Sequence, residues 1–176
     1  YKVLEMCRTR WTGVWKCLRR LEQLRQPIRQ YCASKADQCP AGLSHEEWTA
    51  VHQLEGLLFP FNQVTVALQH EKYPTKGFVL PFVRMLIRKL QRNNIKCLVR
   101  DEHHSVVGDH VRAPVANASL LPMVKATRAD MLESLRKRYP TWTDDLLVAS
   151  VLDPRSKKKT LDVLSAADIR RVKRAL

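Results

Sequence analysis

Residues 44–61, which read SHEEWTAVHQLEGLLFPF, decide the fold class of this chain. Ser44 is followed three residues later by Glu47, the spacing of a capping box in which the hydroxyl and the carboxylate each satisfy a free backbone amide. Apolar side chains then recur at the three- and four-residue spacing of one helix face, at Trp48, Val51, Leu54 and Leu58. Because Pro60 supplies no amide donor, we expect it to end this helix.

The same helical period appears upstream of this stretch. It predicts a helix that Thr9 or Thr12 caps and that Pro27 stops or kinks, with an apolar face at Trp11, Val14, Trp15, Leu18, Leu21 and Leu24. The positive side chains lie off that face, so we expect an amphipathic helix with a basic outer side at Lys16, Arg19, Arg20 and Arg25.

Downstream, Thr75 is expected to be the N-cap of a helix with apolar positions at Phe78, Val79, Phe82, Met85, Leu86 and Leu90. Pro81 fits such a helix only in its first turn, where no amide donor is needed. Arg84, Arg88 and Arg92 follow one another at four-residue spacing, which predicts a single positively charged stripe.

Residues 93–116 lose the helical pattern and are predicted to form a long polar loop, with residues 95–99 ambiguous. The period returns over residues 120–135, and Thr143 is expected to cap a compact apolar helix over residues 144–152. Ser165 begins the last predicted helix.

The expected fold is therefore all-α, an irregular array of six to seven helices in one domain over residues 1–176, with the polar loop at about residues 93–116. We expect Trp11, Trp15 and Trp48 in its core. No alternating strands that would build a sheet are evident.

The charge balance points to a polyanionic partner. Lys and Arg total 31 against 17 Asp and Glu, a net charge of +14. Such an excess favours nucleic acid or an anionic surface; the alternative is a basic surface balanced by an acidic neighbouring domain. No apolar run approaches the roughly 20 residues that cross a bilayer, so no membrane partner is expected. Since the chain lacks an initial Met and ends on a helical pattern, we expect a fragment of a longer protein.

Metal and cofactor sites have little support in the sequence. The five cysteines contain no CxxC pair, which argues against a zinc finger and fits a reducing compartment. One cluster, His103, His104, Asp109 and His110, has an order and spacing that match no known ligand set. A solvated polar loop is the preferred interpretation there, with a metal site as the alternative, and no cofactor is predicted.

The sequence gives no positive reason to expect an enzyme. It contains no GxGxxG, GxxxxGK[ST], GxSxG or HExxH motif. The paired acids at residues 46–47 and 144–145 lie in first helical turns, where capping and the helix dipole explain them. Asp153 before Pro154 is most simply a helix terminator.

A basic and aromatic cluster at the start of the chain is more informative. Residues 7–11, CRTRW, place two guanidinium groups and an indole at the entry of a helix. A Trp stacks on an unpaired base for about 1–3 kcal/mol, and Arg binds neighbouring phosphates bidentately. The alternative is that Trp11 is simply the first core residue of its helix.

Four sequence blocks, in order over residues 7–157, resemble those of the hAT transposase superfamily. Cys7-x-x-Arg10-Trp11 is similar to the C/DxxRW motif, and the line through Leu18, Leu21 and Pro27-Ile28 continues it. The further blocks are Glu47-Trp48…Leu57-Leu58-x-Pro60-Phe61-x-x-x-Thr65, Tyr73-Pro74-Thr75…Val79-Leu80-Pro81, and Leu152-Asp153-Pro154-Arg155-x-Lys157. The chain departs from the family at Ser156, where an aromatic residue is usual.

The resemblance implies the α-helical domain inserted into the RNase H-like catalytic core of these transposases. The three metal-binding acids of that family lie outside the four blocks, so the resemblance implies a segment that is not catalytic alone. It assigns base stacking on a flipped-out base or hairpin flank to Trp11, with Arg10 and Cys7 supporting the motif. Nuclear localisation follows as an expectation.

The expected partner is DNA, with an unpaired or hairpin flank preferred, and a homo-oligomer through the parent protein is a further expectation. The candidate DNA-binding residues are Cys7, Arg8, Arg10, Trp11, Lys16, Arg19, Arg20, Arg84, Arg88, Arg92, Arg155 and Lys157. The alternative function is a protein-interaction or dimerisation module derived from a transposase. A metal-dependent nuclease would require an acid triad within these residues.

Overall fold

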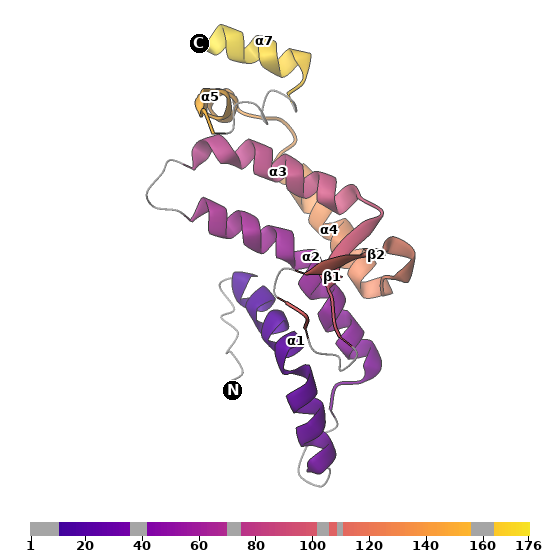
Figure 1. The fold of residues 1–176 in the computed structure, drawn as a ribbon. Helices are drawn as coiled ribbons and strands as arrows, with labels where there is room; N and C mark the ends of the chain where they lie inside the picture. The colour runs from indigo at the N-terminus through magenta and orange to yellow at the C-terminus, as the bar shows by residue number, and fades with distance from the viewer. Residues whose placement is uncertain (1–10, 36–41, 70–74, 102–105, 109–110, 156–163) are drawn as a thin grey trace. The chain divides into compact units, whose positions relative to one another are not determined.

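The computed structural model describes residues 11–35, 42–69, 75–101, 106–108, 111–155 and 164–176. Most of these residues are helical, which confirms the all-α fold class (Figure 1). The helices are α1 (Trp11–Ser34), α2 (His45–Leu68), α3 (Lys76–Gln91), α4 (Pro122–Arg138), α5 (Asp144–Leu152) and α7 (Ala166–Ala175). None of the described helices is both long and apolar enough to span a bilayer.

The chain folds into two compact units, each built from two separate stretches of sequence. Unit 1 comprises Tyr1–Asn62 and Asn93–Thr127, and unit 2 comprises Gln63–Arg92 and Arg128–Leu176. The expectation of a single domain stays a prediction, and the two units are described separately below.

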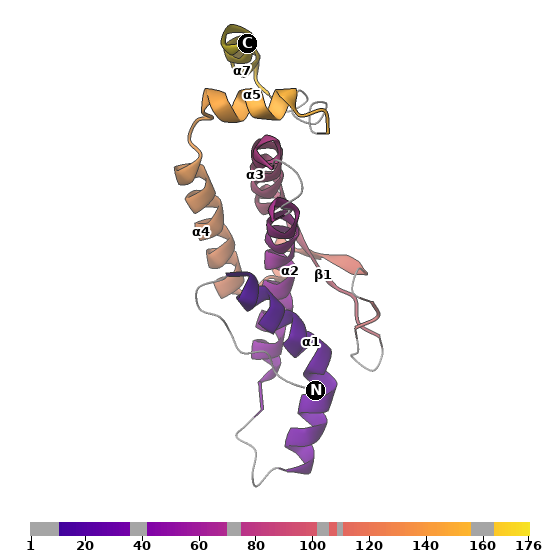
Figure 2. The ribbon, with the colours of Figure 1, turned by 90° about the vertical axis from the view of Figure 1, so that its left-hand side faces the viewer.

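In unit 1, α1 lies beside the first part of α2 (Figures 1 and 2). The predicted capping box is confirmed, because the Ser44 amide donates to Glu47 Oε2 at 2.7 Å and the Glu47 amide donates to Ser44 Oγ at 3.2 Å. Trp48 is buried, as predicted, and Arg25 lies over its ring at 5.2 Å. Trp15 is half-buried and its ring centroid lies 6.1 Å from that of Phe59.

Pro60 does not end α2 as predicted, and Pro27 does not stop α1, so of the two outcomes predicted for Pro27 the kink stays a prediction. Pro60 and Pro27 lie inside α2 and α1, and Pro81 lies at the sixth residue of α3 instead of its first turn. Each proline costs one backbone hydrogen bond. Buried residues on both sides of Pro60, Leu57 and Val64, show the packing that offsets this cost in α2.

The predicted long loop is partly wrong, because it contains a two-stranded antiparallel hairpin. Strands β1 (Asn94–Leu98) and β2 (Arg112–Ala116) pair with Asn94 opposite Ala116 and Leu98 opposite Arg112. The buried side chains of β1 lie against α2 at Gly56, where an added Cβ would be 2.8 Å from Cys97 Sγ and 2.9 Å from the Lys96 carbonyl. Gly56 therefore permits the close approach of strand and helix.

The end of the hairpin is tied to α2 through the buried side-chain amide of Gln53. Gln53 Nε2 donates to the Ser119 carbonyl in η1 (Asn117–Ser119) at 3.0 Å, and its Oε1 accepts from the Leu121 amide at 2.8 Å. This side chain fixes the chain as it leaves β2.

In unit 2, α3, α5 and α7 pack around Leu80, Leu147 and Val172. The predicted bounds of α5 at residues 144–152 and the start of the last helix after Ser165 are confirmed. Thr75 and Thr143 occupy the N-cap positions of α3 and α5, but neither side chain makes a capping hydrogen bond.

Candidate nucleic-acid interface

The start of the predicted interface lies outside the described residues. This applies to Cys7, Arg8 and Arg10, and to Lys157 near the other end of the chain. Trp11 is the first residue of α1, but its side chain is likewise outside the description. The stacking role of Trp11 therefore stays a prediction.

The basic side chains of α1 do not share one outward face. Lys16 is exposed, and Arg20 is half-buried with Nη1 donating to Gln23 Oε1 at 3.2 Å. Arg19 is only 7% exposed, so its placement on a basic outer side is wrong. The reason is a buried carboxylate on α2: Arg19 Nη1 lies 3.8 Å from Glu55 Oε1.

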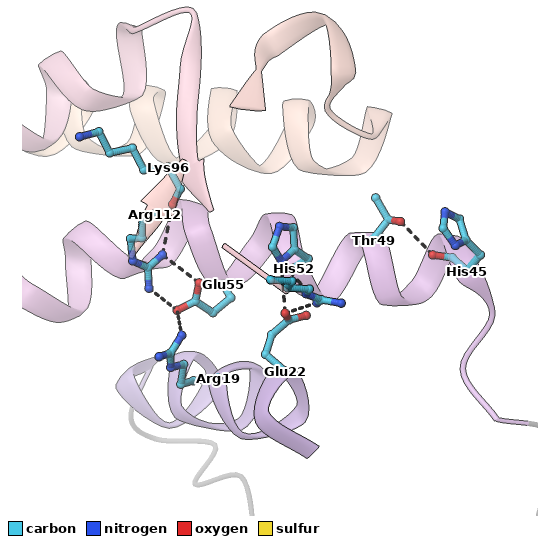
Figure 3. Close-up of polar contacts among 9 residues, drawn as sticks. Arg19, Glu22, His45, Thr49, His52, Glu55, Lys96 and Arg112 are labelled. Atoms are coloured by element: carbon cyan, nitrogen blue, oxygen red, sulfur yellow. Dashed lines mark hydrogen bonds and ion pairs between the residues drawn. The ribbon is translucent and has the colours of Figure 1, made fainter. Parts of the chain in front are cut away.

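Glu55 is the centre of a buried charge cluster in unit 1 (Figure 3). Its side chain is fully buried, and Arg112 of β2 donates from Nη1 to Oε2 at 2.9 Å and from Nη2 to Oε1 at 2.6 Å. Arg112 also donates to the Lys96 carbonyl at 3.1 Å and lies 3.5 Å from the centroid of the Phe59 ring. A bidentate pair of this kind fixes the hairpin onto α2.

A second carboxylate, Glu22 of α1, is buried beside the first (Figure 3). Its Oε2 pairs with Arg100 Nη2 and lies 3.2 Å from His52 Nδ1, while Arg100 Nη2 is 3.4 Å from the same ring nitrogen. Glu22 Oε1 is buried and accepts no hydrogen bond within the described residues. These contacts join α1, α2 and the segment after β1.

Sequence reasoning missed both glutamates. The signal available was their position, since Glu55 interrupts the apolar run LEGLL at residues 54–58 and Glu22 lies between Leu21 and Leu24. A carboxylate on the buried face of a helix requires a cationic partner, and the two arginines that hydrogen-bond to these acids, Arg100 and Arg112, lay in the segment that lacked a helical pattern.

In unit 2, the arginine stripe of α3 has two different environments. Arg84 Nη2 is 3.4 Å from Asp168 Oδ2, and its guanidinium lies 5.5 Å from the Trp142 ring centroid. Arg88 and Arg92 are exposed, and Arg92 is the C-cap of the helix. Of the three, Arg88 and Arg92 are therefore exposed and Arg84 is half-buried.

Arg155 is engaged by its own neighbour. It donates from Nε to Asp153 Oδ1 at 3.0 Å and from Nη2 to Oδ2 at 2.7 Å, which holds the pKa of Asp153 below its ordinary value. Its guanidinium lies 4.7 Å from the Phe78 ring centroid. A Cβ on Gly77 would be 2.8 Å from Asp153 Cβ, so α3 at Gly77 closely approaches the chain at Asp153.

The remaining polar groups include one unreactive thiol. Burial, and secondly the charge of Glu55, raise the pKa of Cys97 to about 12, so this thiol stays protonated at neutral pH. The cluster of His103, His104, Asp109 and His110 lies outside the described residues. Within the part of the chain that is described, no three His, Cys, Asp or Glu side chains gather as a metal site would require.

Comparisons of the chain with protein-family models, with curated proteins and with solved structures found no match. The likeness to hAT transposases therefore depends on the four sequence blocks alone.

Proposed function

We propose that this chain is a DNA-interacting helical segment of a hAT-like transposase or of a domesticated derivative, acts in the nucleus, and is not catalytic alone. The observation that carries the proposal is the distribution of charge. The buried acids Glu22 and Glu55 and the unit 2 acids Asp153 and Asp168 are already paired with arginines of this chain.

Exposed cations are left over from this internal pairing. Lys16, Arg88 and Arg92 are exposed, and within the described residues no ion pair engages them. With a net charge of +14, the surface presents a surplus of cations that a phosphate backbone neutralises. The four blocks in family order favour DNA among polyanions.

The test is fluorescence anisotropy with a labelled duplex that carries an unpaired flank, at about 50 mM and about 200 mM salt. Arg88→Ala/Arg92→Ala is expected to make the dependence of log affinity on log salt shallower by roughly 2. Arg29→Ala/Lys35→Ala, two exposed cations of unit 1 outside the candidate set, is the matched control. Affinity that ignores salt would contradict the proposal.

The stacking assignment has its own comparison. We expect Trp11→Ala to weaken binding to the unpaired flank by roughly 5- to 150-fold, since stacking contributes about 1–3 kcal/mol per base, and to change binding of plain duplex little. Trp11→Phe keeps an aromatic face and should retain most of the affinity. Equal losses on both DNAs would assign Trp11 to the core of its helix.

A protein-interaction or dimerisation module is the second candidate. Large apolar side chains are exposed on several helices, at Tyr31 (58%), Val66 (53%), Met123 (52%) and Leu152 (60%). Light scattering with size-exclusion chromatography discriminates the two, because a strict monomer that binds DNA favours the first.

A further inference from the structure

Helix α7 is anchored to unit 2 by apolar and polar contacts together. Val172 is buried with Leu80 of α3 and Leu147 of α5. The N-terminus carries a capping box, in which the Asp168 amide donates to Ser165 Oγ at 3.1 Å and the Ser165 amide donates to Asp168 Oδ2 at 3.3 Å. One face of α7 is therefore held in a fixed orientation.

The inward polar groups of α7 are used in this anchoring. Arg171 Nη2 donates to the Trp142 carbonyl at 2.8 Å and to Asp144 Oδ1 at 2.6 Å. Asp168, the only acid within the helix, also pairs with Arg84. These contacts consume one cation and the single carboxylate of α7.

The other cations of α7 point away from this anchor. Arg170, Lys173 and Arg174 are all exposed, and their spacing of three and four residues places them on one helix face. Within the described residues none of the three takes part in an ion pair. The other exposed residues of this face are Ala166 and Ala167, so it carries no negative charge.

This arrangement has a cost that a polyanion would remove. Like charges at this spacing repel one another and destabilise a helix. The helix dipole explains Lys173 and Arg174 in the last turn, but it does not explain Arg170 in the turn before. Three cations held on a rigid face suit a row of phosphates, since the helix is already ordered before binding.

We propose that the face formed by Arg170, Lys173 and Arg174 is a second contact surface for the phosphodiester backbone of duplex DNA, independent of base sequence. The proposal rests on the DNA-interacting function proposed above, and adds a surface that the motif blocks do not include.

The experiment compares two triple variants of the whole chain. Arg170→Ala/Lys173→Ala/Arg174→Ala removes the proposed face, and Arg136→Ala/Lys137→Ala/Arg138→Ala removes the same charge from exposed positions in the last turn of α4. Binding of a short plain duplex is measured between about 50 mM and about 200 mM salt. The quantity compared is the slope of log affinity against log salt concentration. We expect this slope to become shallower by roughly 2 to 3 in the α7 variant and to stay at the wild-type value in the α4 variant.

The outcomes separate this proposal from the proposed function. Wild-type binding with an unchanged slope in the α7 variant overturns the α7 surface and leaves the proposed function standing, whereas no wild-type binding overturns both. Equal losses in both variants show an effect of net charge only, and overturn the α7 surface. A third outcome also overturns the α7 surface: the wild-type chain binds phosphatidylserine vesicles but not DNA, and the α7 variant no longer binds the vesicles.

Folding is checked by circular dichroism. If the alanine variant does not fold, Arg170→Gln/Lys173→Gln/Arg174→Gln removes the same charges with polar side chains and receives the same measurement.

Discussion

At the scale of single residues, the two buried glutamates of unit 1 are the most consequential side chains. Glu22 and Glu55 lie on neighbouring helices, and each receives an arginine from the hairpin segment, Arg100 or Arg112. A buried ion pair adds little net stability over an apolar pair, but removal of one partner leaves an uncompensated charge. The contribution of these ion pairs to the free energy of unfolding is therefore seen most clearly when only one partner of a pair is substituted.

Glu55→Gln should lower the free energy of unfolding by roughly 3 kcal/mol or more, because the buried Arg112 guanidinium would lose the carboxylate that it binds with both of its terminal nitrogens. Glu46→Gln in the first turn of the same helix is the matched control, since Glu46 is exposed. Urea unfolding measures both. A loss at Glu55 no larger than at Glu46 would contradict the buried cluster.

Cys97 should make the protein less stable as the pH rises above 9. Its pKa is about 12 in the folded chain against an ordinary value of 9.0, so between these values the unfolded chain releases a proton that the folded chain retains. Stability is retained below pH 9 and falls as the pH rises toward 12. Because other groups titrate in the same pH range, the free energy of unfolding is measured for wild type and for Cys97→Ala at each pH. A difference between the two free energies that stays constant from pH 9 upward would contradict the prediction.

At the scale of elements, the sequence was most informative where local chemistry sets an end. The Ser44–Glu47 box, the bounds of α5 and the start of α7 were all predictable, because capping and the helical period are local properties. The continuation of α2 through Pro60 and the presence of the hairpin were not predictable, because both depend on residues distant in sequence. The first depends on the packing that buries α2, and the second on the close approach of Cys97 to Gly56. For the same reason the burial of Arg19 could not be foreseen.

Gly56→Ala should destabilise unit 1 although alanine is the better helix former. The added Cβ would meet Cys97 Sγ at 2.8 Å and the Lys96 carbonyl at 2.9 Å, and such overpacking costs about 1–3 kcal/mol. Ala126→Gly, on an exposed turn of α4, is the control for helix propensity alone. Glycine costs about 1 kcal/mol relative to alanine inside a helix, so without the close contact Gly56→Ala would be stabilising by about that amount. Thermal unfolding is the measurement, and a stabilised Gly56→Ala protein would exclude the close contact.

The capping box of α2 makes a prediction about pH. The Ser44 amide and then its hydroxyl lower the pKa of Glu47 below 4.5. The stabilisation is therefore present above pH 4.5 and is lost as the pH falls through the lower pKa of the folded chain. Titration of the Glu47 carboxyl by NMR should show the lowered pKa, and Ser44→Ala should return it toward 4.5.

At the scale of the whole molecule, a net charge of +14 opposes compactness. Among the described residues, acids such as Glu55 and Asp144 are used in short internal pairs, and exposed cations such as Arg88 and Arg92 take part in no ion pair that would relieve their repulsion. We expect the melting temperature to rise with added salt, because screening acts on exposed charges far more than on buried pairs.

A short duplex should raise the melting temperature more than simple salt does, since a ligand that binds the folded state stabilises it by mass action. Scanning calorimetry with and without duplex tests this. A melting temperature that falls with salt would show that exposed ion pairs outweigh the repulsion.

The hairpin of residues 94–116 is more than a surface appendage, because Arg100 and Arg112 supply countercharge to the two carboxylates between α1 and α2. A shortened version of this protein that joined residue 93 directly to residue 117 would leave both acids inside the fold without their arginine partners from this segment. Such a deletion should be tolerated better when Glu22 and Glu55 are replaced as well, because the partners outside the hairpin, His52 beside Glu22 and Arg19 beside Glu55, do not supply the bidentate pair of Arg112. The hairpin and the two acids therefore form one electrostatic unit within this fold.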